Sequence, residues 1–378
     1  MTDARTPAPS TSMPYEVEST DELASVLDTD KPLAGARLQG LDLRAHEEAL
    51  LKRRDVQGLI VLGGKLSAQL EQHLRAHGAM IFPTDAGVPL RPYRGSLYTP
   101  SELYAGIESD GYDETVDARA YRWSQDASIR HDAYVSVLRA IHDDSMGDAL
   151  HALLDGRDVV GVMGGHALAR GTEGFANAAR LGHRLATDGH VVVTGGGPGA
   201  MEAANLGAWA RDHDILDRAL ADLADVPTFD AGLDAWVAVA LATRGAQGDD
   251  EQVRSVGIPT WHFGHEPPNV FAQRIAKFFS NAVREDVLLE SSDAGLVVLP
   301  GAAGTVQEIF QMVTRLYYET VELPQPLILV GREHWRTDVP VWPLLLALGQ
   351  DRPMGGNLHL VDSIDEVAEV LRDVEADS

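Results

Sequence analysis

Short apolar runs alternate with amphipathic segments over the second half of the chain. The runs predict buried strands, because a strand that is covered on both faces shows no polar alternation. The predicted strands are Val159–Met163, Val191–Thr194, residues 258–263, residues 296–299, Leu327–Val330 and Leu358–Val361. The segments between them predict helices at about 172–188, from residue 200, at 270–289 and at 305–318. This alternation indicates an α/β fold with a parallel sheet that helices cover on both faces.

A smaller α/β domain is predicted before this region. An apolar strand at 58–63, a helical segment at 66–77 and a second strand at 79–83 have the order of a βαβ unit. Residues 89–126 look irregular, and residues 127–154 predict a helix that joins the two parts.

The predicted organisation has three parts. We expect residues 1–20, rich in Pro, Ser and Thr, to form a disordered tail. Residues 21–150 form the N-terminal α/β domain with its connecting helix, and residues 151–378 form the main domain. Within the main domain, residues 211–256 interrupt the alternation and predict a helical insertion, with an apolar helix near 233–243.

Composition narrows the classes of function. The 378 residues include 57 acidic and 31 basic side chains, a formal net charge of −26. Such a charge repels polyanions, so we expect no nucleic-acid partner and no membrane partner. The chain has no cysteine, which excludes disulfides and thiol chemistry. Neither a secretory signal nor a long apolar span is evident, and we expect a cytoplasmic protein.

A glycine-rich turn follows the strand Val191–Thr194. It reads GGGPGAME over residues 195–202 and leads into a helix. Glycines let the backbone approach a ligand, and the start of a helix offers free N–H groups to an anion. Two alternatives stay open: a dinucleotide-binding turn, which lacks its acidic partner at the end of the next strand, and a tight turn without a ligand.

A second glycine-rich turn follows the strand at 296–299. It reads PGAAGTVQE over residues 300–308, and again a helix begins as the loop ends. Thr305 can cap that helix or offer its hydroxyl to a phosphate. Glu308 lies one turn into the helix, on the face of Gly304, and Arg284 lies on the preceding helix. Because the carboxyl ends of parallel strands share one edge of a sheet, both turns are expected to build one phosphate site.

These residues resemble the LOG family, once called lysine-decarboxylase-like proteins. The hallmark of that family is PGGxGTxxE, with an upstream helix arginine and a GGGxxGxM turn. The form GPGAME is more similar to the long bacterial members, the pyrimidine/purine nucleotide 5′-monophosphate nucleosidases, which also carry an N-terminal domain. The resemblance covers about residues 157–332 and implies a Rossmann-like, doubly wound parallel sheet.

The resemblance also implies a function. We expect hydrolysis of a nucleoside 5′-monophosphate to free base and ribose 5-phosphate by a homodimer or larger homo-oligomer, without a metal or other cofactor. Glu308 and Arg284 are the expected catalytic residues. The expected substrate-binding and phosphate-binding residues are Gly164, Gly165, His166, Gly195, Gly196, Gly197, Gly199, Met201, Glu202, Pro300, Gly301, Ala302, Ala303, Gly304 and Thr305. Glu202 is expected near the ribose or the base.

Two positions depart from the family pattern. Ala302 replaces a glycine, and Glu285 replaces a lysine beside Arg284. These departures favour one rival interpretation, a non-catalytic nucleotide-binding or regulatory protein. A second rival is a carrier of a phosphorylated cofactor such as the molybdenum cofactor. Lysine decarboxylation is rejected, because it needs pyridoxal phosphate on a lysine and Lys277 is expected in mid-helix. His262, His265 and Glu266 form a weak candidate metal cluster.

Overall fold

The computed structural model describes residues 15–29, 31–83, 87–246, 248, 252–263, 266–318 and 325–377. The chain forms two compact units, residues 1–95 and 96–378. Both are α/β units built on parallel sheets, so the predicted fold class is confirmed. No helix in these described ranges combines the length and the apolar character needed to cross a membrane.

The smaller unit has a four-stranded parallel sheet in the order β1-β2-β3-β4. Its core is a cluster of buried aliphatic side chains, including Leu38 and Val61 of the sheet and Leu70 of a covering helix. The elements are β1 (Glu16–Val17), α1 (Thr20–Asp28), β2 (Arg37–Gln39), η1 (Leu43–His46), α2 (Glu47–Lys52), β3 (Ile60–Leu62), α3 (Ala68–Ala76) and β4 (Met80–Phe82).

Part of the predicted tail is ordered structure. Residues 1–14 lie outside the described part of the chain, but β1 pairs with β2. Ser19 then caps α1, because its hydroxyl accepts a hydrogen bond from the Glu22 N–H at 3.2 Å. The prediction of disorder is therefore wrong for residues 15–20, where sheet pairing and a helix cap hold a polar sequence in place.

The larger unit has a seven-stranded parallel sheet in the order β11-β10-β9-β5-β6-β7-β8. The strands are β5 (Val159–Met163), β6 (Val191–Thr194), β7 (Ser255–Gly257), β8 (Arg274–Ile275), β9 (Gly295–Val298), β10 (Leu327–Val330) and β11 (Leu358–Val361). Strand order reverses between β5 and β9, which lie side by side in the middle of the sheet. Ligands bind at such a switch point, outside the carboxyl ends of the strands.

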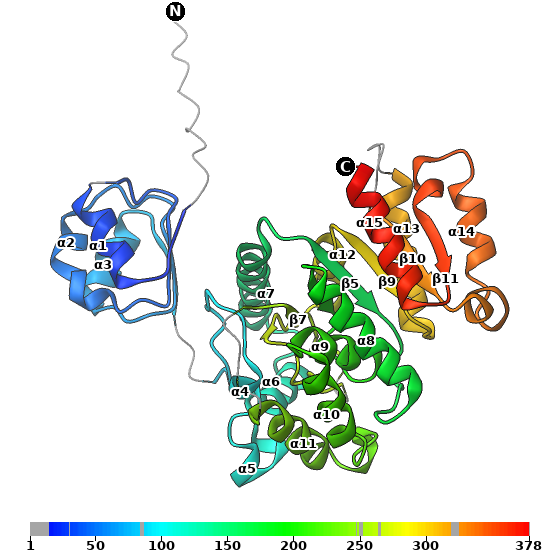
Figure 1. The fold of residues 1–378 in the computed structure, drawn as a ribbon. Helices are drawn as coiled ribbons and strands as arrows, with labels where there is room; N and C mark the ends of the chain where they lie inside the picture. Colours follow the sequence, from blue (N-terminus) through cyan, green and yellow to red (C-terminus); the bar gives the residue numbers. More distant parts are fainter. Residues whose placement is uncertain are drawn as a thin grey trace, which may run out of the picture. The chain divides into compact units, whose positions relative to one another are not determined.

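Helices surround this sheet in a doubly wound arrangement (Figure 1). Those before β9 are α4 (Pro100–Leu103), α5 (Ile107–Asp110), η2 (Tyr112–Glu114), α6 (Val116–Gln125), α7 (Ala133–Leu154), α8 (Glu173–Thr187), α9 (Ala200–Trp209), α10 (His213–Leu223), η3 (Phe229–Ala231), α11 (Leu233–Gly245) and α12 (Asn281–Glu290). Those after β9 are α13 (Ala303–Tyr318), η4 (His334–Asp338), α14 (Trp342–Gly349), η5 (Pro353–Asn357) and α15 (Ile364–Asp377).

One face of the sheet carries the main core. Helices α8 and α9 pack side by side (Figure 1), and α15 joins them. Phe175 of α8 and Leu206 of α9 belong to the same buried cluster as Val297 of β9. The neighbouring strand residues Leu296 and Val298 are also buried, and because successive side chains alternate they point to the opposite face. The sheet is therefore covered on both faces.

The segment from β7 to α12 differs most from the prediction. A strand was expected at 258–263, but β7 ends at Gly257, before Pro259, which has no N–H for a sheet. A helix was expected at 270–289, but residues 270–280 are non-helical and include β8. Their apolar side chains are buried at the sheet edge, and α12 begins only after Ser280, which caps it.

The boundary between the units lies after Gly95, whereas the sequence indicated a boundary near residue 150. The segment 96–154 packs on the large sheet. Tyr98 and Ile275 exchange two backbone hydrogen bonds of 2.9 and 2.8 Å. Asp143 of α7 accepts hydrogen bonds from the N–H groups of Phe279 and Ser280, each at 2.8 Å. Long-range contacts of this kind are not visible in local sequence patterns.

The expected insertion is helical, and it contains α10, η3 and α11. Its last part is not an insertion, because β7 already begins at Ser255. Trp236 of α11 is fully buried in the main core cluster, so the insertion is an integral part of the larger unit.

Candidate functional site

The first glycine turn, residues 195–199, joins β6 to α9. Thr194 organises it: its hydroxyl oxygen accepts from the Gly196 N–H at 2.9 Å and donates to Asn205 at 2.7 Å. Asn269 donates from its backbone N–H to the Gly196 carbonyl and from its side chain to the Gly197 carbonyl, at 2.8 and 3.1 Å. The carbonyl groups of this turn are therefore occupied by the protein itself.

Four N–H groups of the same turn and of the start of α9 are without a partner among the described residues. Gly197, Gly199, Met201 and Glu202 have no hydrogen-bond acceptor for their backbone N–H groups within the part of the chain that the structure describes. Gly197, Gly199 and Glu202 are buried, and Met201 is half-buried. Because buried N–H groups without partners are rare, these donors indicate a place for a water or an anionic ligand.

Two glycines of this turn are required by the backbone. Gly199 has a φ of +73°, and a Cβ atom there would lie 2.5 Å from the carbonyl oxygen of His166. Gly196 has a φ of +71°, and its Cβ would lie 2.7 Å from Pro259. Only glycine allows these conformations at such close approach. Part of the glycine pattern is therefore explained by packing of the turn against neighbouring loops.

The second glycine turn joins β9 to α13 and contacts the loop after β5. The Gly165 N–H donates to the Pro300 carbonyl at 3.1 Å. The backbone N–H groups of residues 302–305 have no acceptor among the described residues, and Ala302, Ala303 and Gly304 are exposed. No atom lies within 4 Å of a Cβ position on Gly304. The start of α13 therefore presents four free donors to solvent or a ligand.

Helix α13 begins at Ala303, two residues earlier than predicted. Thr305 is therefore inside the first turn of the helix and is not its N-cap. Its side chain is buried and would clash with any Cβ on Gly301, which explains the glycine at that position. His334, which the sequence analysis missed, lies at 3.3 Å from the Gly301 nitrogen and 3.0 Å from its carbonyl oxygen.

Arg284 and Glu308 meet beside both turns. The Arg284 Nη1 and Glu308 Oε1 atoms are 3.3 Å apart, and the side chains are 7% and 14% exposed. Arg284 Nη1 also lies 3.8 Å from the Cβ position of Gly195 in the first turn. The buried Nε of Arg284 has no hydrogen-bond partner among the described residues. This guanidinium therefore has a donor left for a ligand.

The pKa of the Glu308 carboxyl is raised above its usual range. Burial is the main cause, the nearby Arg284 opposes it, and the negative charges of Glu285 and Glu266 add to it. The Glu308 carboxyl therefore holds its proton more firmly than an exposed glutamate does.

Glu285, the unusual neighbour of Arg284, is turned away from this pair. Its carboxylate accepts hydrogen bonds from the side chains of Asn281 at 2.7 Å and Gln307 at 2.6 Å. It therefore braces α12 against α13 through the residue next to Glu308. The Glu285 carboxylate, at the position where the family has a lysine, therefore accepts one hydrogen bond from a side chain of each helix.

Glu202 is held by a buried partner that the sequence did not predict. Its two carboxylate oxygens accept from Arg170, at 2.5 and 3.0 Å, and both side chains are 1% exposed. Arg170 also donates to the Trp236 carbonyl at 3.1 Å and lies over the Trp236 ring. This pair ties the first helix turn of α9 to the insertion. Sequence reasoning missed Arg170 because it lies in a loop without a recognisable motif.

The loop after β5 places His166 near Glu266, which the sequence suggested only as part of a metal cluster. His166 Nδ1 lies 3.7 Å from Glu266 Oε1, with side chains 53% and 22% exposed. The other carboxylate oxygen of Glu266 lies 4.0 Å from the Cβ position of Gly197. Glu266 thus stands between His166 and the first glycine turn. Gly164 packs beneath this loop, since its Cβ would lie 2.7 Å from Ala200.

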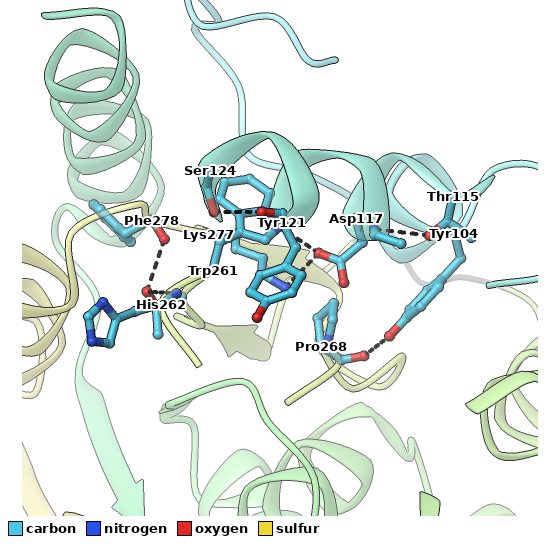
Figure 2. A network of polar contacts seen from close by, with 12 residues as sticks. Tyr104, Thr115, Asp117, Tyr121, Ser124, Trp261, His262, Pro268, Lys277 and Phe278 are labelled. Atoms are coloured by element: carbon cyan, nitrogen blue, oxygen red, sulfur yellow. Dashed lines mark hydrogen bonds and ion pairs between the residues drawn. The ribbon is translucent and has the colours of Figure 1, made fainter. Parts of the chain in front are cut away.

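A buried polar network fixes the loop that carries Glu266. Figure 2 shows the Asp117 carboxylate on α6 receiving hydrogen bonds from Trp261 at 2.8 Å and from Lys277 at 2.5 Å. Tyr104 donates its hydroxyl to the carbonyl of Pro268, two residues after Glu266. Lys277 is therefore a buried structural cation in an extended segment, and the prediction that it lies in mid-helix is wrong.

The candidate metal cluster finds no support in the described ranges. No group of three His, Cys, Asp or Glu side chains there could hold a metal ion. His262 is exposed, with its ring against Phe263, and His265 lies outside the described residues.

Two segments of the chain match known families. Residues 239–374 match a family described as possible lysine decarboxylase, and residues 157–213 match the SLOG cluster4 family. The comparison with curated proteins finds no match. The two matched segments contain both glycine turns, together with Arg284 and Glu308.

The comparison with solved structures also gave matches of low sequence identity. The molybdenum cofactor binding protein from the phototrophic bacterium Rippkaea orientalis is 19% identical, with 58% of this chain and 98% of that chain covered and a TM-score of 0.36. The molybdenum cofactor carrier protein from Chlamydomonas reinhardtii is 18% identical, with 58% and 99% covered and a TM-score of 0.35.

Proposed function

Because the chain belongs to the LOG family of lysine-decarboxylase-like proteins, we propose that it hydrolyses the N-glycosidic bond of nucleoside 5′-monophosphates to free base and ribose 5-phosphate. One observation carries the proposal. The Arg284–Glu308 pair lies beside the starts of α9 and α13. The N–H groups of Met201 and Glu202 in α9, and of residues 302–305 at α13, have no partner in the described part of the chain. In a bound sugar phosphate, the N–H donors would bind the phosphate group, and the buried carboxylate beside them would face the sugar ring.

The 5′-phosphate is assigned to the start of α13. Four N–H groups there, from Ala302 to Thr305, have no partner among the described residues, and the positive end of the helix dipole adds to their attraction for an anion. Gly304 leaves open space above the backbone, so a phosphate oxygen can reach the N–H groups. Ala302, which replaces the family glycine, is exposed at this mouth.

The ribose is assigned to the space beside Glu308 and Arg284. Breaking an N-glycosidic bond builds positive charge on the ribose ring. A buried carboxylate stabilises that charge strongly because little water screens it. Glu308 also takes a proton from the attacking water, for which it must be ionised. The guanidinium of Arg284, beside Glu308, holds a ribose hydroxyl or a phosphate oxygen and keeps the sugar in place.

Lysine decarboxylation does not fit the residues. It would need pyridoxal phosphate bound to a lysine. Lys277 is the only lysine between residues 96 and 378, and it is 1% exposed with its ammonium paired to Asp117. Its amine is therefore committed to a structural contact, and we derive no step through that cofactor.

A second candidate function is binding of a phosphorylated ligand without turnover. Ala302 favours it, because a methyl group replaces a glycine hydrogen at the phosphate mouth. Glu308 disfavours it, since phosphate binding alone gains nothing from a carboxylate that burial makes costly to ionise. Incubation with a panel of nucleoside 5′-monophosphates separates the two. Release of base and ribose 5-phosphate in equal amounts supports hydrolysis, whereas binding of a nucleotide with no release supports the second candidate.

A further inference from the structure

A cavity of about 250 Å³ lies beside the first glycine turn. Three segments enclose it: the loop after β5, the start of α9 and the insertion around η3. Its lining residues include His166, Leu168, Pro198, Glu202, Phe229 and Asp230.

We propose that this cavity receives the base of the nucleotide and that His166, held by Glu266, donates the proton that the departing base requires. The inference rests on the proposed hydrolysis and adds the step that Glu308 and Arg284 do not supply. Those two residues stabilise the sugar and activate water, but a base leaves poorly as an anion. A proton donor on the side of the base is therefore needed.

The cavity has the size and chemistry for a nucleobase. Pockets for drug-sized ligands start at roughly 300 Å³, so a smaller cavity suits a single flat ring system. Phe229 and the two prolines Pro198 and Pro227 offer apolar surfaces to the faces of such a ring, and Thr228 and Asp230 offer polar groups to its edge. Aromatic side chains stack on any base, since every base has a π face.

His166 is placed to act on that base. It lines the cavity and is about half exposed, so its ring reaches the ligand space. Glu266 lies 3.7 Å from its Nδ1 and can orient the ring so that Nε2 is left for the ligand. The segment that follows Glu266 is anchored by two hydrogen bonds: Tyr104 donates to the Pro268 carbonyl, and Asn269 donates to the Gly197 carbonyl of the first glycine turn.

The other acidic groups of the cavity are less suited. Both carboxylate oxygens of Glu202 are occupied by Arg170, and this pair is almost completely buried. Asp230 is exposed at the cavity wall without a cationic partner in the described residues, and it serves as the matched alternative. A larger cavity of about 740 Å³ runs along α8 and the start of α15, but His166 does not line it.

The proton balance of the step is complete. The C1′–N bond breaks, and its electron pair goes to the base nitrogen while the His166 imidazolium gives a proton to the base. Water adds to C1′ and gives one proton to Glu308. Transfer of that proton from Glu308 to His166 through solvent restores both residues. The net reaction consumes one nucleotide and one water and yields base and ribose 5-phosphate.

Leaving-group dependence tests the role of His166. The full-length wild type, His166→Gln and Asp230→Asn are assayed on natural nucleotides and on the 4-nitrophenyl riboside 5-phosphate, whose phenolate departs without a proton. We expect His166→Gln to lower kcat roughly 100-fold on the nucleotides and about twofold or less on the nitrophenyl substrate. Glu266→Gln should show the same pattern at smaller amplitude, and Asp230→Asn should show none.

Three outcomes would overturn the inference. Equal losses on both substrates would assign His166 a structural or binding role, and the expected pattern in Asp230→Asn would make Asp230 the acid. A wild type that hydrolyses neither substrate would overturn the proposed function and this inference together. A loss confined to natural nucleotides in His166→Gln, with no such loss in Asp230→Asn, excludes the first two outcomes.

The position of the base is tested separately. Phe229→Ala should raise KM for nucleotides about tenfold, the amount that roughly 1.4 kcal/mol of stacking provides. It should leave inhibition by ribose 5-phosphate unchanged, because the sugar phosphate does not enter the cavity. Ile364→Ala, which removes an apolar side chain from the larger cavity, is the matched control. A raised KM in Ile364→Ala with none in Phe229→Ala would place the base in the larger cavity instead.

Discussion

The Glu308 carboxylate lies 3.3 Å from the Arg284 guanidinium, and this pair connects α13 to α12 at the edge of the sheet. The adjacent residues Gln307 and Glu285 make a second contact between the same helices, at 2.6 Å. The two contacts fix how far the start of α13, with its free N–H groups, stands from Arg284. A carboxylate and an anion site are thereby held at a constant separation.

The pH dependence of turnover should reflect the raised pKa of Glu308. The carboxylate form is the active one, so kcat/KM should fall as the pH drops through this pKa, above the ordinary glutamate value of 4.5. Because the charge of Glu285 helps to raise the pKa, Glu285→Gln should move the acid limb to lower pH. The measurement is a kcat/KM profile of both proteins between pH 4 and pH 8. An unchanged limb, or one moved to higher pH, would contradict the assignment.

The same shift has a consequence for stability, with a defined sign. A carboxyl whose pKa is raised by folding binds its proton more tightly in the folded state. Its contribution to stability is therefore present below the unfolded pKa and is lost as the pH rises through the folded pKa. The Glu308→Gln variant has no carboxyl group to titrate at this position. The free energy of unfolding, measured by denaturant titration, should therefore depend less on pH in the variant than in the wild type.

The Arg170–Glu202 pair should matter for stability more than any surface ion pair. Glu202→Ala leaves the Arg170 guanidinium buried without its partner. Breaking such a pair costs about 3–5 kcal/mol, compared with less than about 1 kcal/mol for an exposed pair. Chemical denaturation measures the change. Glu48→Ala, which breaks the exposed pair with Lys52, is the control, and equal effects of the two substitutions would contradict the structural role.

Substitution by alanine should have different effects at two glycines, lowering stability at one and weakening substrate binding at the other. Gly199→Ala places a Cβ atom 2.5 Å from the His166 carbonyl oxygen at a φ of +73°, so it should lower stability by about 1–3 kcal/mol. Gly304→Ala meets open space and should leave stability unchanged, but it should raise KM because its methyl group occupies the phosphate mouth. Thermal unfolding and substrate titration distinguish the two. A stable Gly304→Ala with unchanged KM would remove the phosphate from α13.

Local sequence patterns found the parts of the site that lie in one motif. Both glycine turns follow apolar strands, and Glu308 follows the second turn by a fixed helical spacing, so they could be predicted together. Arg170 could not, because it reaches the site only through packing of distant segments, and Glu266 was selected only as part of a metal cluster. The signal of Arg170 would have been an unpaired charge in a loop next to a strand end, which is too common to be specific.

The fold was predictable where strands are buried on both faces and are long enough to be recognised. β8 was missed because it has two residues, and the apolar side chains around it fit a helical spacing equally well. Pairing at the sheet edge favours the strand over the helix, because Tyr98, from a segment far away in the sequence, pairs with Ile275. Glu202 shows the same limit at the site, because its buried partner Arg170 comes from another loop and could not be predicted.

A homodimer or larger homo-oligomer stays a prediction. Light scattering coupled to size exclusion, at several protein concentrations, measures the mass of the full-length chain. A mass of at least twice the 40.7 kDa of one chain is expected, and a monomer at all concentrations would contradict it.

The most direct test of the account compares the wild type with Glu308→Gln on the nucleoside 5′-monophosphate that the wild type hydrolyses fastest. Free base and ribose 5-phosphate are quantified by chromatography, and nucleotide binding is measured by calorimetry. The account predicts equal amounts of both products from the wild type, a loss of turnover of roughly 10²–10⁴-fold in Glu308→Gln, and nucleotide binding retained in the variant. Undiminished release of base by Glu308→Gln would contradict it.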